Sequence, residues 1–113
     1  MTRLPRSARF ALTLLAACAA APVRADDMPV IKVEMRDGVI LPAVIEVPAN
    51  TRFKLEISNT GQTPVEFESL ELKREKALAA GSTSAIVFRT VEPGTYQVFD
   101  DFHPEAKATL VAK

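Results

Sequence analysis

Apolar and polar residues alternate along several short segments of this chain, and this two-residue period constrains the fold more than any other feature. Side chains that alternate in this way lie on opposite faces of a β-strand. Turn-forming residues such as Asp37-Gly38 and Glu92-Pro93-Gly94 separate the segments. We therefore predict an all-β fold, an antiparallel Greek-key β-sandwich of about seven short strands. The predicted strands cover residues 30–35, 44–47, 53–57, 65–72, 84–89, 95–99 and 108–112.

Residues 73–80 are the least determined part of this pattern. Lys, Arg, Glu and Ala favour a helical turn, yet Gly81 ends it, so the sequence allows one helical turn or an irregular loop. The charged run Lys73-Arg74-Glu75-Lys76 is either a solvated surface or a docking site for an acidic partner.

The first 25 residues differ in character from the rest. Arginines at positions 3, 6 and 9 precede an apolar run from Phe10 to Ala21, and Val23-Arg24-Ala25 provides small residues suited to a signal peptidase. The apolar run is too short to span a bilayer, which takes about 20 residues. We therefore predict a signal peptide over residues 1–25, a single domain over residues 26–113, and a periplasmic location with no direct membrane span.

Cys18 allows a second interpretation of the same segment. Leu15-Ala16-Ala17-Cys18 resembles a lipoprotein box, in which Cys18 would carry a lipid and anchor the chain. The stretch between Arg9 and Cys18 is short for such a signal, so cleavage after Ala25 is favoured and lipid anchoring is the alternative.

Removal of the signal changes the charge and the cysteine content. Four of the 14 basic residues leave with the signal and all 14 acidic residues stay, so the mature chain is acidic. An acidic surface argues against nucleic acid or anionic lipid as a partner, because those require basic patches. The mature chain contains no cysteine, which excludes disulfides, zinc–thiolate sites and thiol nucleophiles. Nothing in it predicts a hydrolase or a transferase.

The most informative segment runs from Pro93 to Ala108 and reads Pro-Gly-Thr-Tyr-Gln-Val-Phe-Asp-Asp-Phe-His-Pro-Glu-Ala-Lys-Ala. It resembles the copper-site hairpin of cupredoxins, which reads Pro-Gly-x-Tyr, a short strand, and then Cys-x-x-His-x-x-Met-x-Gly. On that pattern Asp100 takes the cysteine position, His103 the histidine position and Ala106 the position of the axial methionine. The resemblance implies a cupredoxin-like domain whose metal site has lost its sulfur ligands.

The resemblance also implies a further ligand on an earlier strand, where the family has a second histidine after an Asn-containing turn. Counted from Asn59, that position falls at Val65 or Glu66, and Glu66 is the residue with a ligand to offer. A type 1 blue copper site is excluded because it depends on a thiolate. Carboxylate and imidazole suit Fe(III), Fe(II), Mn(II), Zn(II) or Cu(II), so the cofactor is expected to be an iron or copper ion of another type.

Two segments resemble a narrower group of proteins. Residues 67–76 read Phe-Glu-Ser-Leu-Glu-Leu-Lys-Arg-Glu-Lys, and residues 99–105 read Phe-Asp-Asp-Phe-His-Pro-Glu. Both are similar to cupredoxin-like components of bacterial iron-uptake systems: the small periplasmic partner of a ferrous-iron permease of the Ftr type, and the N-terminal domain of EfeO-type proteins. The resemblance implies a periplasmic protein that binds iron and works with an iron permease and other uptake components. Oxidation of Fe(II) before transfer would need an electron acceptor, either another protein, copper or oxygen.

We expect the metal ligands to come from six residues, the first three of which should converge at one end of the sandwich. First choices before second, they are Glu66, Asp100, His103, Glu68, Asp101 and Glu105. Each has a plain structural alternative, such as a loop imidazole hydrogen-bonded to a carboxylate for His103, or a solvated strand for the glutamates. The competing function is a metal-free cupredoxin scaffold that holds partner proteins together, because a fold does not determine a function.

Overall fold

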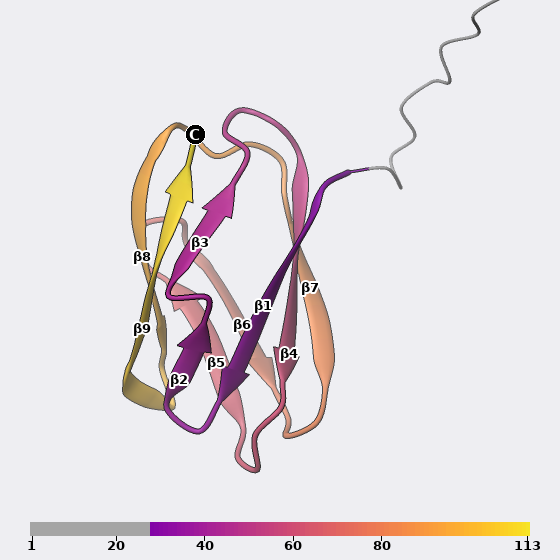
Figure 1. Ribbon diagram of the computed structural model, residues 1–113, viewed down its shortest axis with the longest axis vertical. Helices are drawn as coiled ribbons and strands as arrows, with labels where there is room; N and C mark the ends of the chain where they lie inside the picture. The colour runs from indigo at the N-terminus through magenta and orange to yellow at the C-terminus, as the bar shows by residue number, and fades with distance from the viewer. Residues whose placement is uncertain (1–27) are drawn as a thin grey trace, which may run out of the picture.

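The computed structural model of the protein describes residues 28–113, which form nine strands in two sheets packed face to face (Figure 1). The strands are β1 (Val30–Arg36), β2 (Val39–Leu41), β3 (Val44–Val47), β4 (Phe53–Asn59), β5 (Val65–Ser69), β6 (Arg74–Leu78), β7 (Thr83–Phe88), β8 (Gly94–Asp100) and β9 (His103–Ala112). The predicted signal peptide and the alternative anchor at Cys18 lie outside the described residues. Within those residues, no helix is long and apolar enough to cross a membrane.

The all-β sandwich predicted from the alternating pattern is confirmed, but its pairing is mixed. One sheet has the strand order β2-β1-β4-β7 and the other has the order β3-β9-β8-β5-β6. Two pairs, β1 with β4 and β3 with β9, run parallel, whereas the sequence predicted antiparallel sheets throughout. In neither pair does a hairpin join the two strands, so no tight turn imposes the antiparallel direction.

The segment over residues 73–80 is neither a helical turn nor a loop but contains the strand β6, which pairs antiparallel with β5. Tertiary contacts explain the difference from the prediction. The Arg74 guanidinium donates a hydrogen bond to the Val87 carbonyl at 2.9 Å and lies 4.9 Å from the centroid of the Phe88 ring. These contacts join β6 to β7 across the side of the sandwich, and they favour a strand that local propensity does not.

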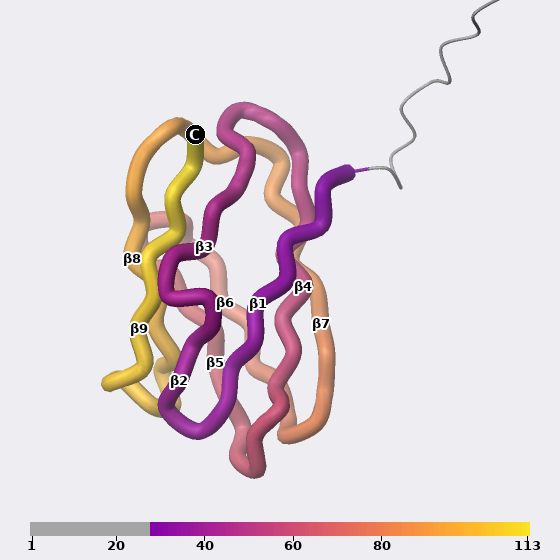
Figure 2. The backbone as a smooth tube through the Cα atoms, in the orientation of Figure 1, coloured from indigo at the N-terminus to yellow at the C-terminus, as the bar shows by residue number. Residues whose placement is uncertain are grey.

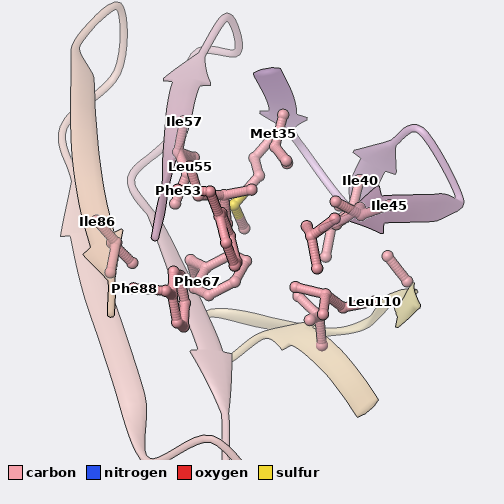
Figure 3. Close-up of a cluster of buried hydrophobic side chains, with 14 of the residues drawn as sticks. Met35, Ile40, Ile45, Phe53, Leu55, Ile57, Phe67, Ile86, Phe88 and Leu110 are labelled. Atoms are coloured by element: carbon pink, nitrogen blue, oxygen red, sulfur yellow. The ribbon is translucent and has the colours of Figure 1, made fainter. Parts of the chain in front are cut away.

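The core lies between the two sheets, where their inward side chains meet (Figure 3). Along β4 the buried residues Phe53, Leu55 and Ile57 alternate with partly exposed polar ones, as the two-residue period predicts. The rings of Phe53 and Phe88 stack with centroids 5.0 Å apart. From the opposite sheet, Leu110 of β9 points into the same core.

Beside the turn between β6 and β7, three further connections meet at one end of this sandwich, the lower end in Figure 2. They are the turn between β1 and β2, the loop between β4 and β5, and the turn between β8 and β9. The rigid sheets hold the ends of all three connections, so polar side chains on them are placed close together.

Neighbouring residues of β3 test the inward and outward faces of the sandwich. Ile45 is fully buried and Val44 is 53% exposed. Ile45→Ala should lower the free energy of unfolding by about 2–5 kcal/mol because it leaves a cavity in the core. Val44→Ala should change it by no more than about 0.5 kcal/mol. Urea denaturation of both variants measures this difference, and equal losses would contradict the assignment of faces.

Candidate functional site

Asp100, the last residue of β8, carries a buried carboxylate, and its side chain is only 2% exposed. Its Oδ1 atom accepts hydrogen bonds from the backbone N–H groups of Glu66 at 2.9 Å and Phe102 at 3.0 Å. Its Oδ2 atom lies 2.8 Å from Nδ1 of His103. A buried carboxylate is costly without such partners, and here both oxygens of Asp100 have them.

The hydrogen bonds continue from His103 across the end of the sandwich. Nε2 of His103 lies 3.2 Å from the Thr63 hydroxyl, and that hydroxyl donates to Oδ1 of Asp37 at 2.8 Å. The Gln62 N–H also donates to the Asp37 carboxylate. These bonds, that of Thr63 first, hold the pKa of Asp37 below its ordinary value. We call Asp37, Thr63, His103 and Asp100 the rim network.

The loop that carries Thr63 is held by a buried amide side chain. Asn59, 1% exposed, donates from Nδ2 to the carbonyls of Thr63 at 2.9 Å and Leu78 at 3.2 Å, and its Oδ1 accepts from the Gly61 N–H at 3.0 Å. A Cβ atom on Gly61 would lie only 2.8 Å from Oδ1 of Asp37. A side chain at position 61 would therefore push the Asp37 carboxylate away from its hydrogen-bond partners in this loop.

A second cluster lies on the outer face of the five-stranded sheet. The side chains of Glu66, Glu68 and Asp101 bring carboxylate oxygens within 4.8 Å of one another. The two glutamates are two residues apart on β5 and so share a face. Asp101 is brought beside them because its N–H donates to the Glu66 carbonyl at 2.9 Å. We call these three residues the carboxylate triad.

The pKa values of Glu66 and Glu68 lie above their ordinary values. In both residues partial burial is the largest cause, and the negative charges of Asp101 and Glu75 add to it. Glu75 lies opposite Glu68 on the neighbouring strand β6. A cation placed among these groups would remove the repulsion that raises their pKa values.

The structure divides the six predicted ligands instead of bringing them to one point. Asp100 and His103 lie in the rim network, whereas the side chains of Glu66, Glu68 and Asp101 form the triad. Strand register explains the division: Phe67 pairs with Asp100 and both point inward, so Glu66 points outward and contributes only its backbone N–H to Asp100.

Glu105 belongs to neither group. It is exposed, and its Oε1 atom lies beside Gly38 in the turn between β1 and β2. The residues that the sequence interpretation missed are Thr63 and Asp37. Asp37-Gly38 reads as an ordinary turn, and only the meeting of three connections reveals that the carboxylate of Asp37 accepts hydrogen bonds from the loop between β4 and β5.

The residues at the end of the sandwich do not fit a blue copper centre. Asp100 stands where the family has its thiolate, and both of its oxygens already accept hydrogen bonds. Ala106, at the position of the axial methionine, is a core residue that is 2% exposed and has no donor atom. The single cysteine of the chain is Cys18, outside the described residues.

Comparison with known sequences gives a family and one relative. A family model of the cupredoxin-like domain matches residues 8–112. An uncharacterized protein of Rickettsia prowazekii (strain Madrid E) is 35% identical over 80 residues, which cover 71% of this chain and 64% of that protein. The chain thus spans slightly less than two thirds of the length of this relative.

Comparison with solved structures finds the same fold at low sequence identity. Reduced auracyanin from the photosynthetic bacterium Roseiflexus castenholzii has a TM-score of 0.64 at 13% identity, over 74% of this chain and 96% of auracyanin. Amicyanin from Paracoccus versutus has a TM-score of 0.59 at 17% identity, over 81% and 86% of the two chains. The metal-binding domain of the Cu(I)-exporting ATPase CopA of Streptococcus pneumoniae, solved with Cu(I), has a TM-score of 0.65 at 13% identity, over 74% and 84%. At these identities the similarity shows the fold alone.

The replacement of the thiolate position by Asp100 has a spectroscopic consequence. The purified domain over residues 26–113, loaded with Cu(II), should be pale, because it has no thiolate to give an intense charge-transfer band in the visible range. An absorption spectrum tests this, with an Asp100→Cys variant as the comparison. An intense visible band in the unchanged domain would contradict the ligand assignment.

The raised pKa values of Glu66 and Glu68 predict a dependence of stability on pH. A group whose pKa is higher in the folded state contributes stability at low pH, and this is lost as the pH rises through the folded value. Glu66→Gln and Glu68→Gln should therefore raise the melting temperature at pH 7, and the gain should disappear below about pH 4.

Melting curves across this pH range measure the effect. Glu46→Gln is the control, because the Glu46 carboxylate lies 3.2 Å from Nζ of Lys113 and removal of its charge should bring no such gain. A lower melting temperature of both triad variants at pH 7 would show that the carboxylates do not repel one another.

Proposed function

The chain belongs to the family of cupredoxin-like domains, and from that premise we propose that it is an exported metal-binding protein that assists iron uptake. The observation that carries this proposal is the carboxylate triad, whose oxygens lie within 4.8 Å of one another. An all-oxygen set of ligands suits hard or borderline ions, such as Fe(III), Fe(II) and Mn(II). Iron is then the cargo of the protein, held on the outer face of the sandwich.

The electrostatics of the triad support the binding of a cation. Glu66 and Glu68 are partly buried and have raised pKa values, so their charges are held together at a cost in stability. A bound cation offsets that cost by pairing with all three carboxylates. Oxygen ligands stabilise Fe(III) more than Fe(II), so the same site favours loss of an electron from bound Fe(II) to an external acceptor such as oxygen or another protein.

The similar structures support a metal-related role, though not the same chemistry. The Streptococcus pneumoniae domain was solved with Cu(I). The described residues here offer no thiol at the matching position, and their grouped ligands are carboxylates, which do not suit Cu(I). The triad therefore disfavours Cu(I), and the proposal of iron as the cargo rests on the resemblance of residues 67–76 and 99–105 to iron-uptake components.

The proposed location and partner follow from the sequence. The N-terminal segment has the pattern of a signal peptide, which would deliver the domain to the periplasm. The two segments that resemble iron-uptake components, residues 67–76 and 99–105, include all of the triad except Glu66. An iron permease is therefore the partner to which this protein would deliver its ion.

A second candidate function is a metal-free scaffold that holds partner proteins together. Phe102 favours it, because this large apolar side chain is 50% exposed at the loop end of the sandwich. It lines an open hollow together with Thr63, Pro64 and His103. An exposed aromatic residue beside such a hollow is a usual feature of a protein contact.

Metal titration of the triad tests the proposal. The purified domain should bind Mn(II), and Fe(II) in the absence of oxygen, and Glu68→Gln or Asp101→Asn should weaken the affinity at least about tenfold, because each removes a charged ligand. Glu105→Gln is the matched control, since it removes an exposed carboxylate outside the triad. Isothermal titration calorimetry measures all four proteins. If the unchanged domain binds neither ion, the metal-free scaffold is favoured. If Glu105→Gln weakens binding as much as Glu68→Gln, the triad is not the site.

A further inference from the structure

We infer that Asp100 and His103 form a metal-independent lock, which joins three connections of the sandwich and positions the carboxylate triad without providing a ligand. These two residues stand at the positions where the family pattern has a cysteine and a histidine ligand. The lock rests on the rim network alone, and only its link to the triad rests on the proposed function.

His103 has no free lone pair to offer an ion. The Thr63 hydroxyl has one hydrogen, which it donates to Asp37, so its contact with Nε2 needs a hydrogen on that nitrogen. The other nitrogen, Nδ1, faces Oδ2 of Asp100 at 2.8 Å, and one proton lies between the two atoms. A metal ligand must be a neutral imidazole nitrogen with its lone pair exposed, and both nitrogens are already in use.

The rim network joins the connections at this end of the sandwich, as a bound ion would do through its ligands. A metal centre at the end of a sandwich would join several connections through its ligands. Here Asp37 comes from the turn between β1 and β2, Thr63 from the loop between β4 and β5, and His103 from the start of β9. Hydrogen bonds between them, with the buried charge of Asp100 at one end, join these segments directly. Within residues 28–113, no buried side-chain nitrogen or oxygen lacks a partner.

Asp100 connects the lock to the carboxylate triad. Oδ1 of Asp100 accepts hydrogen bonds from the N–H groups of Glu66 and Phe102, which lie on β5 and in the turn after β8. Asp101 lies between Asp100 and Phe102 and donates its own N–H to the Glu66 carbonyl. The Oδ1 atom of Asp100 thus holds the backbones of Glu66 and Asp101 in place relative to each other. Asp100 and His103 are positioning residues that lie beneath the site.

Thermal unfolding with and without a chelator tests the lock itself. Asp100→Ala should lower the melting temperature by about 10 °C or more. It removes the acceptor of the Glu66 and Phe102 N–H groups and leaves these buried donors unpaired. His103→Ala and Thr63→Val should cause smaller losses. All three losses should persist undiminished in excess EDTA, where no metal ion is bound. Thr60→Val is the control, since it removes a hydroxyl bonded to Glu34 in the same loop but outside the network.

A conservative variant separates positioning from ligation. In Asp100→Asn the amide oxygen can still accept from Glu66 and Phe102, and the amide nitrogen can donate to Nδ1 of a neutral His103. Asp100→Asn should therefore keep most of the melting temperature and nearly all of the Mn(II) affinity, whereas Asp100→Ala should lose both. If Asp100 were a ligand, Asp100→Asn would itself weaken Mn(II) binding by at least about tenfold.

Pulsed electron paramagnetic resonance detects an imidazole nitrogen bound to the ion, and a purely structural role of His103 would give no such signal. His103 is the only histidine of the chain, so coupling of bound Mn(II) or Cu(II) to an imidazole nitrogen would come from this residue. We expect no such coupling in the unchanged domain. Its appearance would overturn the lock, as would stability losses in Asp100→Ala and His103→Ala that vanish in EDTA. Failure of the domain to bind either ion would contradict the proposed function and leave the stability test of the lock in force.

Discussion

A buried carboxylate needs hydrogen-bond donors, and the donors that surround the Asp100 side chain, which is 2% exposed, hold the loop end of this sandwich together. Two of them are backbone N–H groups, from Glu66 on β5 and from Phe102 after β8, and the third partner is the ring of His103. If Asp100 moved, the end of β8, the start of β9 and the neighbouring part of β5 would have to move with it. The position of the carboxylate triad is a consequence of the same constraint, because Glu66 and Asp101 are held through their backbones.

The sandwich could be predicted from the sequence because burial on one face imposes a two-residue period, as the alternation of Phe53, Leu55 and Ile57 shows. The strand β6 could not, since its residues Arg74-Glu75-Lys76 favour a helix locally. Its pairing with β5 and the contact of Arg74 with Val87 and Phe88 make a strand of them. The three-residue strand β2 is too short to show any period. The parallel pairing of β1 with β4 and of β3 with β9 could not be predicted either, because the direction of pairing depends on how the chain crosses between the sheets.

The candidate site was predictable in its residue types but not in its grouping. The family pattern indicates Asp100 and His103 correctly as residues of the loop end, and these two side chains do meet. It does not show which side of β5 faces them, and a strand turned by one residue exchanges Glu66 for Phe67. Thr63 and Asp37 carry no pattern of their own, so their part in the network follows only from the meeting of distant loops. A shared fold therefore locates a site more reliably than it assigns the chemistry there.

We propose that two tasks which a single metal centre would combine are separate in this protein: hydrogen bonds hold the end of the sandwich together, and carboxylates on its outer face hold the ion. Anomalous diffraction from crystals of the domain grown with Mn(II) tests this separation most directly, because it locates the ion without reference to any variant. We expect one strong peak bounded by Glu66, Glu68 and Asp101, with the hydrogen bond between Asp100 and His103 intact. A peak within bonding distance of His103, with that hydrogen bond broken, would contradict the proposal.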